Sequence, residues 1–335
     1  MKVLITGITG LMGGLLARHL LDEHPGYEVV GTHRWRSRMH AVEGIKRRLD
    51  LRECDVRDAS SVRRLVAAVK PDRIFHLAAQ SSVQASQHAP ADTLATNVVG
   101  LVNLLEAVRE HHPAARILVP GSSEEYGLQE DSAQAVVETS PLRPLSPYGV
   151  SKVTQDMLGL QYHESYKLHI VRTRAFNHTA PGREDVFVES SFARQIAEIE
   201  AGLREPVVRV GNLEVVRDYS DARDVARAYA LALERCVSGE VYNICSERGV
   251  RIGEMLDMLA SMSTARIEVV RDPERVRERE APVLVGSAAR FRATTGWAPT
   301  IPLEQTLREI LEYWRGQVRA DQRALQATPS TGGER

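Results

Sequence analysis

Short apolar runs alternate with amphipathic segments along the first half of the chain. The runs that read as strands are residues 2–6, 28–32, 49–54, 73–77, 116–119 and 169–173. Helices are predicted between them, for example over residues 59–69, 92–109 and 148–166, because apolar residues recur there near a period of 3.6. Such alternation predicts an α/β fold with a doubly wound parallel sheet. After residue 174 the pattern becomes irregular.

Length and composition add a second, smaller lobe to this picture. A chain of 335 residues that is 43% hydrophobic can bury a large core and exceeds the usual span of one domain. The last residues, 319–335, have no apolar period, and we expect them to be disordered.

Charge and cysteine content exclude several classes of protein. The formal net charge of −1 gives no global basic field, so we expect neither nucleic acid nor a membrane as a partner. Cys54, Cys236 and Cys245 are too few and too scattered for a disulfide framework or a metal site. No apolar stretch approaches the roughly 18 residues of a membrane span, and a strand occupies the place of a signal peptide. A cytoplasmic location is expected.

The motif TGITGLMG, at residues 6–13, follows the first strand directly and opens a helix. Gly7 can turn with positive φ, Gly10 allows close approach of a pyrophosphate, and Gly13 allows close packing of helix on sheet. Leu11 and Met12 begin the helix, whose N–H groups can bind an anion. A glycine-rich loop alone is weak evidence, but this context predicts a dinucleotide site.

The residues after the second strand indicate which dinucleotide binds. NAD enzymes usually place Asp or Glu there to bind the ribose hydroxyls, but this chain reads GTHRWRSR. Arg34 and Arg36 suit a 2′-phosphate, and Trp35 can stack beside the adenine. NADP(H) is therefore favoured over NAD(H), with an exposed basic loop or a subunit contact as the alternative.

Tyr148 and Lys152 are spaced four residues apart in a predicted helix, which puts a phenol and an ammonium on one face. A nearby positive charge favours the phenolate, so this pair can exchange a proton with a sugar hydroxyl or carbonyl. Such pairs also occur by chance on solvated helices. The neighbouring motifs favour catalysis.

A second group of polar residues follows the fifth predicted strand, in the sequence GSSEEYG. Ligands of open parallel sheets bind beyond the carboxyl ends of the strands. Ser122 can hydrogen-bond a reacting oxygen, and Glu124 can exchange a second proton. A helix cap followed by a polar loop explains the same residues equally well, without any catalytic role.

Together these motifs resemble the extended short-chain dehydrogenase/reductase family, whose members have a Rossmann fold and modify nucleotide sugars. The stretches RTRAFNHTAPGR (172–183), VGNLEVVRDYSDARDV (210–225) and VYNICS (241–246) resemble the branch that handles GDP-mannose-derived sugars. Within it the likeness is greatest to GDP-6-deoxy-4-ketomannose reductases, with GDP-mannose 4,6-dehydratases next. It covers residues 1–318.

The resemblance implies a division into lobes and further cofactor contacts. Residues 1–174 would form the NADP-binding domain, to which residues 216–245 return, and residues 175–215 and 246–318 would form the substrate-binding lobe. The positions that match the family's dinucleotide contacts are Asp55, Val56, Leu77, Ala78 and Ala79. Asn97 is expected to be structural.

Substrate contacts are also carried over from the family. The matching positions are Asn177, Arg183, Asn212, Arg217, Arg277 and Glu280. Arg217 is the strongest candidate for the diphosphate because a guanidinium fork suits phosphate oxygens. Relatives commonly read Arg-Pro-x-Glu where this chain reads Arg277-Glu278-Arg279-Glu280, which puts the contact of Glu280 in doubt. Each residue could instead be an ordinary surface charge.

The implied reaction is transfer of a hydride from NADPH to the C4 ketone of a GDP-linked 6-deoxyhexose, with a proton from Tyr148. A 4,6-dehydratase that uses Glu124, a 4-epimerase and a sensor that binds dinucleotide without chemistry are the alternatives. The sequence does not fix the nucleotide base or the size of the sugar. Relatives pair through the helices at 92–109 and 148–166, so we expect a homodimer. A tetramer, through the loop at 35–39, is the alternative.

Overall fold

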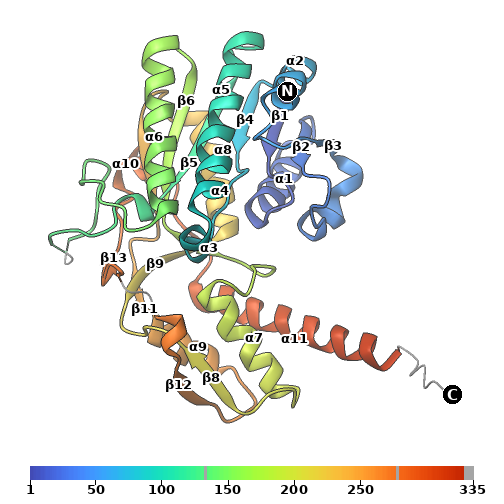
Figure 1. The fold of residues 1–335 in the computed structure, drawn as a ribbon, viewed down its shortest axis with the longest axis vertical. Helices are drawn as coiled ribbons and strands as arrows, with labels where there is room; N and C mark the ends of the chain where they lie inside the picture. The colour runs from blue at the N-terminus through green and yellow to red at the C-terminus, as the bar shows by residue number, and fades with distance from the viewer. Residues whose placement is uncertain (132–133, 277–278, 328–335) are drawn as a thin grey trace. The chain divides into compact units, whose positions relative to one another are not determined.

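The computed structural model describes residues 1–131, 134–276 and 279–327. The chain divides into two compact units (Figure 1). The first contains Met1–His178, Val216–Val250 and Arg279–Ile301, and the second contains Thr179–Val215, Arg251–Glu278 and Pro302–Arg335 as far as they are described.

The first unit is built on a seven-stranded parallel sheet. In sequence order its strands are β1 (Lys2–Thr6), β2 (Glu28–His33), β3 (Asp50–Glu53), β4 (Arg73–His76), β5 (Arg116–Ser122), β6 (His169–Ala175) and β10 (Val241–Ile244). Their spatial order is β10-β6-β5-β4-β1-β2-β3. The order reverses between β1 and β4, which is the switch point where ligands of doubly wound sheets bind. The predicted fold is confirmed.

Helices cover both faces of this sheet. They are α1 (Leu11–Glu23), α2 (Ala59–Val69), α3 (Val83–His88), α4 (Pro90–Leu94), α5 (Gly100–His111), α6 (Pro147–Tyr166), α8 (Ala222–Arg235) and α10 (Ala289–Thr295), with a π-helix η2 (Ala95–Val99) and 3-10 turns η1 (His40–Arg48) and η3 (Ser123–Glu125). A smaller sheet has the order β11 (Gly249–Arg251), β9 (Val216–Asp221), β13 (Val283–Leu284), and β7 (Asn177–Thr179) pairs with β9.

The core has two layers because successive side chains of a strand point to opposite faces. Val3 and Ile5 pack with α1 and α8, whereas Leu4 packs with α2 and α5. Phe75 and Ile74 of β4 divide in the same way. Burial on both faces explains why these strands read as continuous apolar runs.

The second unit contains α7 (Val188–Glu200), α9 (Ile252–Ser261) and α11 (Leu303–Ala327), a parallel pair of strands, β8 (Val207–Val210) and β12 (Glu268–Arg271), and the 3-10 turn η4 (Pro273–Arg275). Trp314 of α11 donates its indole N–H to Ser190 Oγ of α7 at 2.8 Å. Arg315 donates to both carboxylate oxygens of Glu200 at 2.6 Å. Helices α7 and α11 are thereby joined by polar contacts.

The structure corrects the prediction for the C-terminal tail. Residues 319–327 continue α11, although disorder was expected from residue 319; residues 328–335 lie outside the described part. Good helix formers extend an existing helix at little cost even without an apolar period. Val318, 6% exposed, anchors the preceding turn.

Residues 279–301 also differ from expectation, because they pack with the first unit and not with the smaller lobe. Trp297 is 1% exposed, and its indole N–H donates to the carbonyl of Asp224 at 3.0 Å. The Asp224 carboxylate accepts from the backbone of Thr300 and Ile301 at 2.8 and 2.9 Å. A few specific contacts with Asp224 thus hold this irregular stretch on the first unit. The periodicity of the sequence does not predict these contacts.

The helix predicted over residues 92–109 is interrupted. Its middle is the π-helix η2, where Asn97 accepts from the backbone N–H of Gln80 at 2.8 Å and donates to Ser151 Oγ at 2.9 Å. A π-turn places one extra residue in a helical turn, and such turns often occur where a polar side chain interrupts the regular hydrogen bonds of the helix. Here that side chain is Asn97.

One helical stretch of the described residues, 90–111, passes the length and composition test for a membrane-spanning helix. No such stretch was expected from the sequence. It consists of α4, η2 and α5, and Leu101, Leu104 and Leu105 are fully buried in the core. Helices buried in a protein core pass the same test, so this is weak evidence for a membrane span.

Candidate active site

The glycine turn after β1 has the conformation that the sequence predicts. Gly7 has φ of +70°, and a Cβ there would lie 2.8 Å from the backbone of Ala78, so only glycine fits. A Cβ on Gly13 would lie 2.6 Å from Ile8 Cα, which explains the close packing of α1 on the turn. Gly10 is the N-cap residue of α1 and has no side chain to occupy the helix N-terminus.

Three strand ends are tied together around this turn. Thr6 Oγ1 accepts from the N–H of Ala78 at 3.2 Å and lies 3.0 Å from His76 Nδ1. Thr32 Oγ1 accepts from the N–H of Gly7 at 3.2 Å. Leu11, Met12, Leu77, Ala78 and Ala79 are all half-buried along the same edge. This edge can present backbone N–H groups to a dinucleotide, and the binding roles of these residues stay predictions.

The basic loop follows β2 as a tight turn. The N–H of Arg34 donates to Ser37 Oγ, and the N–H of Ser37 donates to the Arg34 carbonyl, both at 3.0 Å. The side chains of Arg34, Trp35 and Arg36 are exposed. Since β2 ends in His33 and no carboxylate follows it in the turn, the loop fits a phosphate better than a ribose diol.

Asp55 and Val56 follow β3 and have contacts within the protein. The Asp55 carboxylate accepts from Arg57 Nη2 at 2.7 Å, and Arg57 holds the pKa of Asp55 below its usual range, with a smaller effect of Arg34. Val56 is 5% exposed, and its carbonyl accepts from Asn103 Nδ2 at 2.9 Å. Their predicted contact with adenine stays a prediction.

Ser122 is the last residue of β5 and the N-cap of η3. Its Oγ accepts from the N–H of Glu124 at 3.2 Å, while its own N–H donates to Glu125 Oε1 at 2.7 Å. This reciprocal arrangement is a capping box. Ser122 is 9% exposed, and Glu124 is half-buried. The cap and the candidate catalytic residue are therefore the same serine.

Tyr148 and Lys152 lie in the first turns of α6, one turn apart as predicted. Ser146 caps this helix, with its Oγ accepting from the N–H of Gly149 at 3.0 Å. Lys152 Nζ donates to the Pro120 carbonyl at 2.9 Å and lies 5.9 Å from the centre of the Tyr148 ring. These contacts hold the pair against the carboxyl end of β5, two residues from Ser122.

Burial controls the charge of this region. Tyr148 and Lys152 are 9% and 5% exposed. Burial lowers the pKa of Lys152 to about 8, against an opposing effect of Glu125. Burial, reinforced by Lys152, lowers the pKa of His76 to about 3. His76 is therefore neutral at pH 7, and Lys152 supplies the positive charge beside Tyr148.

A buried charge cluster that the sequence did not predict is formed by Glu125, Asp156, Arg172 and Arg174. Glu125 is fully buried, and Arg174 Nε lies 3.2 Å from its Oε2. Arg174 and Arg172 donate to the two oxygens of Asp156 at 2.6 Å. The signal that could have found Glu125 is the S-x-x-E spacing of a capping box. No local pattern announces the two arginines.

The predicted substrate residues are divided between the units. Arg217 of β9 pairs with Glu280 at 3.1 Å, and Asn177 lies on β7 in the same sheet. Arg183 and Asn212 belong to the second unit, where Arg183 lies over the Phe187 ring at 3.5 Å and Asn212 Oδ1 accepts from the N–H of Glu214 at 3.1 Å. Arg277 lies outside the described residues. Their contacts with a substrate stay predictions.

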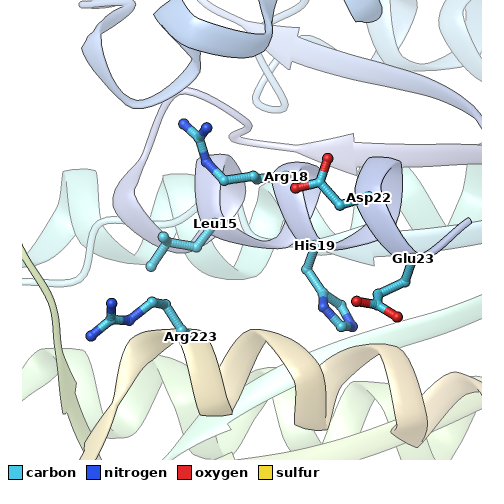
Figure 2. A pocket seen from close by; sticks show the side chains of 6 residues that line it. All are labelled: Leu15, Arg18, His19, Asp22, Glu23 and Arg223. Atoms are coloured by element: carbon cyan, nitrogen blue, oxygen red, sulfur yellow. The ribbon is translucent and has the colours of Figure 1, made fainter. Parts of the chain in front are cut away.

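A shallow pocket of about 180 Å³ lies between α1 and α8. Figure 2 shows the residues that line it, Leu15, Arg18, His19, Asp22, Glu23 and Arg223. Two arginines and two carboxylates line it, and none of the described residues that line it is a predicted site residue. We assign the pocket no role in the chemistry.

Comparison with known proteins places these observations in context. Residues 4–310 match the GDP-mannose 4,6 dehydratase family. The chain is 34% identical to GDP-6-deoxy-D-mannose reductase of Pseudomonas aeruginosa over 96% of its length and 99% of the relative's. It is 32% identical to GDP-mannose 4,6-dehydratase of Yersinia enterocolitica over 92% of both chains. The solved structure of RMD from Pseudomonas aeruginosa complexed with NADPH matches with a TM-score of 0.81 and 31% identity, covering 94% of this chain and 99% of that one.

Proposed function

The chain belongs to the GDP-mannose 4,6-dehydratase family, and we propose that it reduces the C4 ketone of GDP-4-keto-6-deoxy-D-mannose with NADPH, giving a GDP-rhamnose-type product. The observation that carries this proposal is the buried pair of Tyr148 and Lys152 held against the end of β5 beside Ser122. The similarity to a GDP-6-deoxy-D-mannose reductase over nearly the whole chain supports the choice of reaction.

NADP(H) is proposed as the cofactor, in preference to NAD(H). The residues present fit it: Gly7 and Gly10 leave the α1 N-terminus open to the pyrophosphate, and Arg34 and Arg36 are available for the 2′-phosphate. Asp55, Val56 and the half-buried turn at Leu77–Ala79 would flank the adenosine and the diphosphate. When bound, the cofactor supplies the hydride.

The residues of the chain handle the proton and the developing charge. Tyr148 donates its phenolic proton to the substrate oxygen as that oxygen becomes negative. Ser122 donates a hydrogen bond to the same oxygen, and its backbone is already fixed by the capping box. Lys152 carries a positive charge one helical turn from Tyr148, and it would hold the nicotinamide ribose. Burial keeps water from competing with these donors.

Arg217, Glu280 and Asn177 of the first unit, together with Arg183, Asn212 and Arg277, are proposed to bind the GDP-sugar. Arg217 would bind the diphosphate. To do so, its guanidinium group must replace the ion pair with Glu280 by a contact with a phosphate oxygen.

A GDP-mannose 4,6-dehydratase is the second candidate, and one observation favours it. Glu124 is present, half-buried, and its backbone is held by Ser122 Oγ, so it can move a proton at C5 or C6. Incubation separates the two reactions. Oxidation of NADPH with the 4-keto sugar supports the reductase, whereas loss of water from GDP-mannose without added NADPH supports the dehydratase.

The same screen distinguishes the remaining alternatives. Interconversion of nucleotide sugars without net redox change identifies a 4-epimerase. Firm NADP(H) binding without turnover of any nucleotide sugar identifies a non-catalytic sensor. Product masses decide whether the sugar is a hexose or a heptose and which base the nucleotide carries.

A homodimer that pairs through α4–α5 and α6 is proposed for the assembly, with a tetramer through the loop at 35–39 as the alternative. The exposed apolar side chains Leu94, Val99, Val150 and Met157 on these helices support it. Sedimentation of the parent and of a Val150→Glu variant tests the contact. A cytoplasmic location is also proposed, since Cys54, Cys236 and Cys245 are all free and buried.

A further inference from the structure

Asp218 follows Arg217 on β9 and is fully buried, at 0% exposure, although the proposed reaction does not use it. Its Oδ1 accepts the backbone N–H and the hydroxyl of Ser246, at 2.8 and 2.6 Å. Its Oδ2 accepts the N–H of Glu247 at 3.0 Å and that of Gly286 at 3.4 Å. The carboxylate therefore joins three segments of the first unit, which are β9, the turn after β10 and the residues after β13.

The pairing of β9 with β13 is short. Strand β13 has two residues, and the register places its Leu284 beside Arg217. Strands of globular proteins usually have about 3–10 residues, so a pairing of this length contributes few backbone hydrogen bonds. Gly286 lies just beyond β13, and its contact with Asp218 extends the connection between the two segments.

The turn after β10 is held in one conformation. Glu247 has φ of +62°, in the left-handed region that residues other than glycine seldom adopt. Its N–H donates to Asp218, and its carboxylate accepts the N–H of Ala288 at 2.9 Å and pairs with Arg292 at 2.6 Å. Such backbone strain persists only where the surrounding contacts enforce it. The turn is therefore a rigid support for Asp218.

Arg217 and Asp218 act on the same two segments from opposite faces of β9, because successive side chains of a strand alternate between its faces. Arg217 Nη1 donates to the Val216 carbonyl at 2.9 Å, and its Nη2 lies 3.1 Å from Glu280 Oε1. Glu280 precedes β13, and Gly286 follows it. Contacts from neighbouring residues of β9 thus reach both sides of β13 and determine where the Arg217 guanidinium lies.

We propose that Asp218 is a positioning residue of the GDP-sugar site, which fixes the backbone of Arg217 by holding β9 to the turn at Ser246–Glu247 and to Gly286. This inference rests on the diphosphate role proposed above for Arg217. A guanidinium forms two parallel hydrogen bonds with phosphate oxygens only in a defined geometry, so a displacement of β9 weakens binding. Asp218 contacts no ligand itself and acts through Arg217.

Each of these contacts uses an oxygen of Asp218 as an acceptor, which explains the need for a carboxylate. Burial raises the pKa of Asp218, and the hydrogen bonds from Ser246, Gly286 and Glu247 oppose that rise. Asparagine has nearly the same shape, but its amide nitrogen is a donor. In Asp218→Asn this nitrogen would face either the two donors of Ser246 or the two backbone N–H groups, so one side of the site is lost.

The test is the affinity of the full-length protein for GDP, measured by isothermal titration. We expect Asp218→Asn to raise the Kd for GDP by about threefold or more. The increase should not exceed that of Arg217→Met, because Asp218 acts through Arg217. The Kd for NADPH should stay the same.

Asp224→Asn is the matched control. Asp224 is 2% exposed, and its carboxylate accepts the N–H groups of Thr300 and Ile301 at 2.8 and 2.9 Å and the Thr300 hydroxyl at 2.8 Å. It resembles Asp218 in its burial and in the donors that it binds, and it also pairs with Arg227. Asp224→Asn should lose stability and leave the Kd for GDP unchanged. A general loosening of the fold would instead raise the Kd in both variants and contradict the proposal.

A double-mutant cycle shows whether Asp218 acts through Arg217. In the background Arg217→Met/Glu280→Leu, Asp218→Asn should change the Kd for GDP by less than about twofold, because the guanidinium that it positions is absent. A loss of affinity of the same size in both backgrounds refutes the proposal, since Asp218 would then affect GDP by another route.

An unchanged Kd for GDP in folded Asp218→Asn protein also overturns the proposal. If that variant does not fold, Ser246→Ala removes one donor, the hydroxyl 2.6 Å from Oδ1, and a rise of about twofold or more in the Kd is required of it. Failure of the proposed function gives a different result. Full GDP affinity in Arg217→Met/Glu280→Leu, or no GDP binding by the parent protein, would defeat the phosphate role of Arg217 and this inference with it.

Discussion

Arg217 Nη2 lies 3.1 Å from Glu280 Oε1, so two residues predicted separately to contact the substrate contact each other. Their side chains are 7% and 15% exposed, which makes this a largely buried ion pair. Removal of one partner from such a pair leaves an uncompensated charge and destabilises the protein, whatever the partner's role in binding. A test of Arg217 in substrate binding must separate these effects.

We expect Arg217→Met to weaken GDP binding at least about tenfold, because a charge-assisted contact to phosphate is lost. Arg217→Met should also lower the free energy of unfolding, since the buried ion pair with Glu280 is lost. The double variant Arg217→Met/Glu280→Leu should regain stability without regaining affinity. Isothermal titration with GDP and urea denaturation measure the two quantities. Full GDP affinity in the stable double variant would contradict the phosphate role.

Tyr148→Phe removes the proposed proton donor and leaves the ring. We expect kcat to fall by about 10²- to 10⁴-fold, the usual contribution of general acid catalysis, with the Kd for NADPH unchanged. Tyr162→Phe, on the same helix, is the control: it loses a 2.8 Å hydrogen bond to Glu106 and should cost about 1 kcal/mol of stability without changing kcat. Turnover of Tyr148→Phe at the parent rate would refute the assignment.

Gly7→Ala tests the glycine turn. The alanine would have to adopt a positive φ, and its Cβ would lie 2.8 Å from the backbone of Ala78. We therefore expect a loss of about 2–4 kcal/mol in the free energy of unfolding and no NADPH binding. Gly202→Ala is matched in φ, at +68°, but no atom lies within 4 Å of its added Cβ, and it should cost only about 1–2 kcal/mol. Equal losses in the two variants would show that the contact with Ala78 has no cost.

Glu200 makes the stability of the second unit depend on pH. Burial opposes its ionisation, but hydrogen bonds from Arg315, Thr264 and Ser263 outweigh burial and lower the pKa of Glu200 to about 2. The folded pKa lies below the unfolded value, so this stabilisation is complete above about pH 5 and is lost as the pH falls toward 2.

Glu200→Gln should therefore lower the free energy of unfolding by about 1–3 kcal/mol at pH 7 and by less at pH 3, measured by urea denaturation. Glu304→Gln removes a carboxylate of an exposed pair with Arg308 and should change stability by at most about 0.5 kcal/mol at either pH. A pH-independent difference for Glu200→Gln would be inconsistent with this account.

Much of the first unit was predictable from the sequence because burial leaves a local signal. The run at residues 2–6 is β1 and the segment 59–69 is α2, with the bounds predicted. Strands buried on both faces read as apolar runs, and amphipathic helices repeat every 3.6 residues. Tyr148 and Lys152 were found for the same reason, since their relation lies within one helix.

The contacts that the sequence analysis missed join residues far apart in the chain. Arg174 meets Glu125 across 49 positions, and Trp297 meets Asp224 across 73. Neither pairing changes the local periodicity of apolar and polar residues, which is the signal that a sequence pattern carries. The mixed apolar and polar stretch at 279–301 therefore could not be assigned to a unit, and the helical continuation of α11 past residue 318 could not be distinguished from a polar tail.

The position of β10 at one edge of the sheet has a consequence for biosynthesis. Strand β6 pairs with β5 on one side and with β10 on the other, and β10 is made about 70 residues later than β6. During translation β6 is a bare edge strand, open to pairing with another nascent chain, until residue 244 emerges from the ribosome. Trp297 emerges later still. The native sheet of this unit therefore cannot be completed until most of the chain has been made.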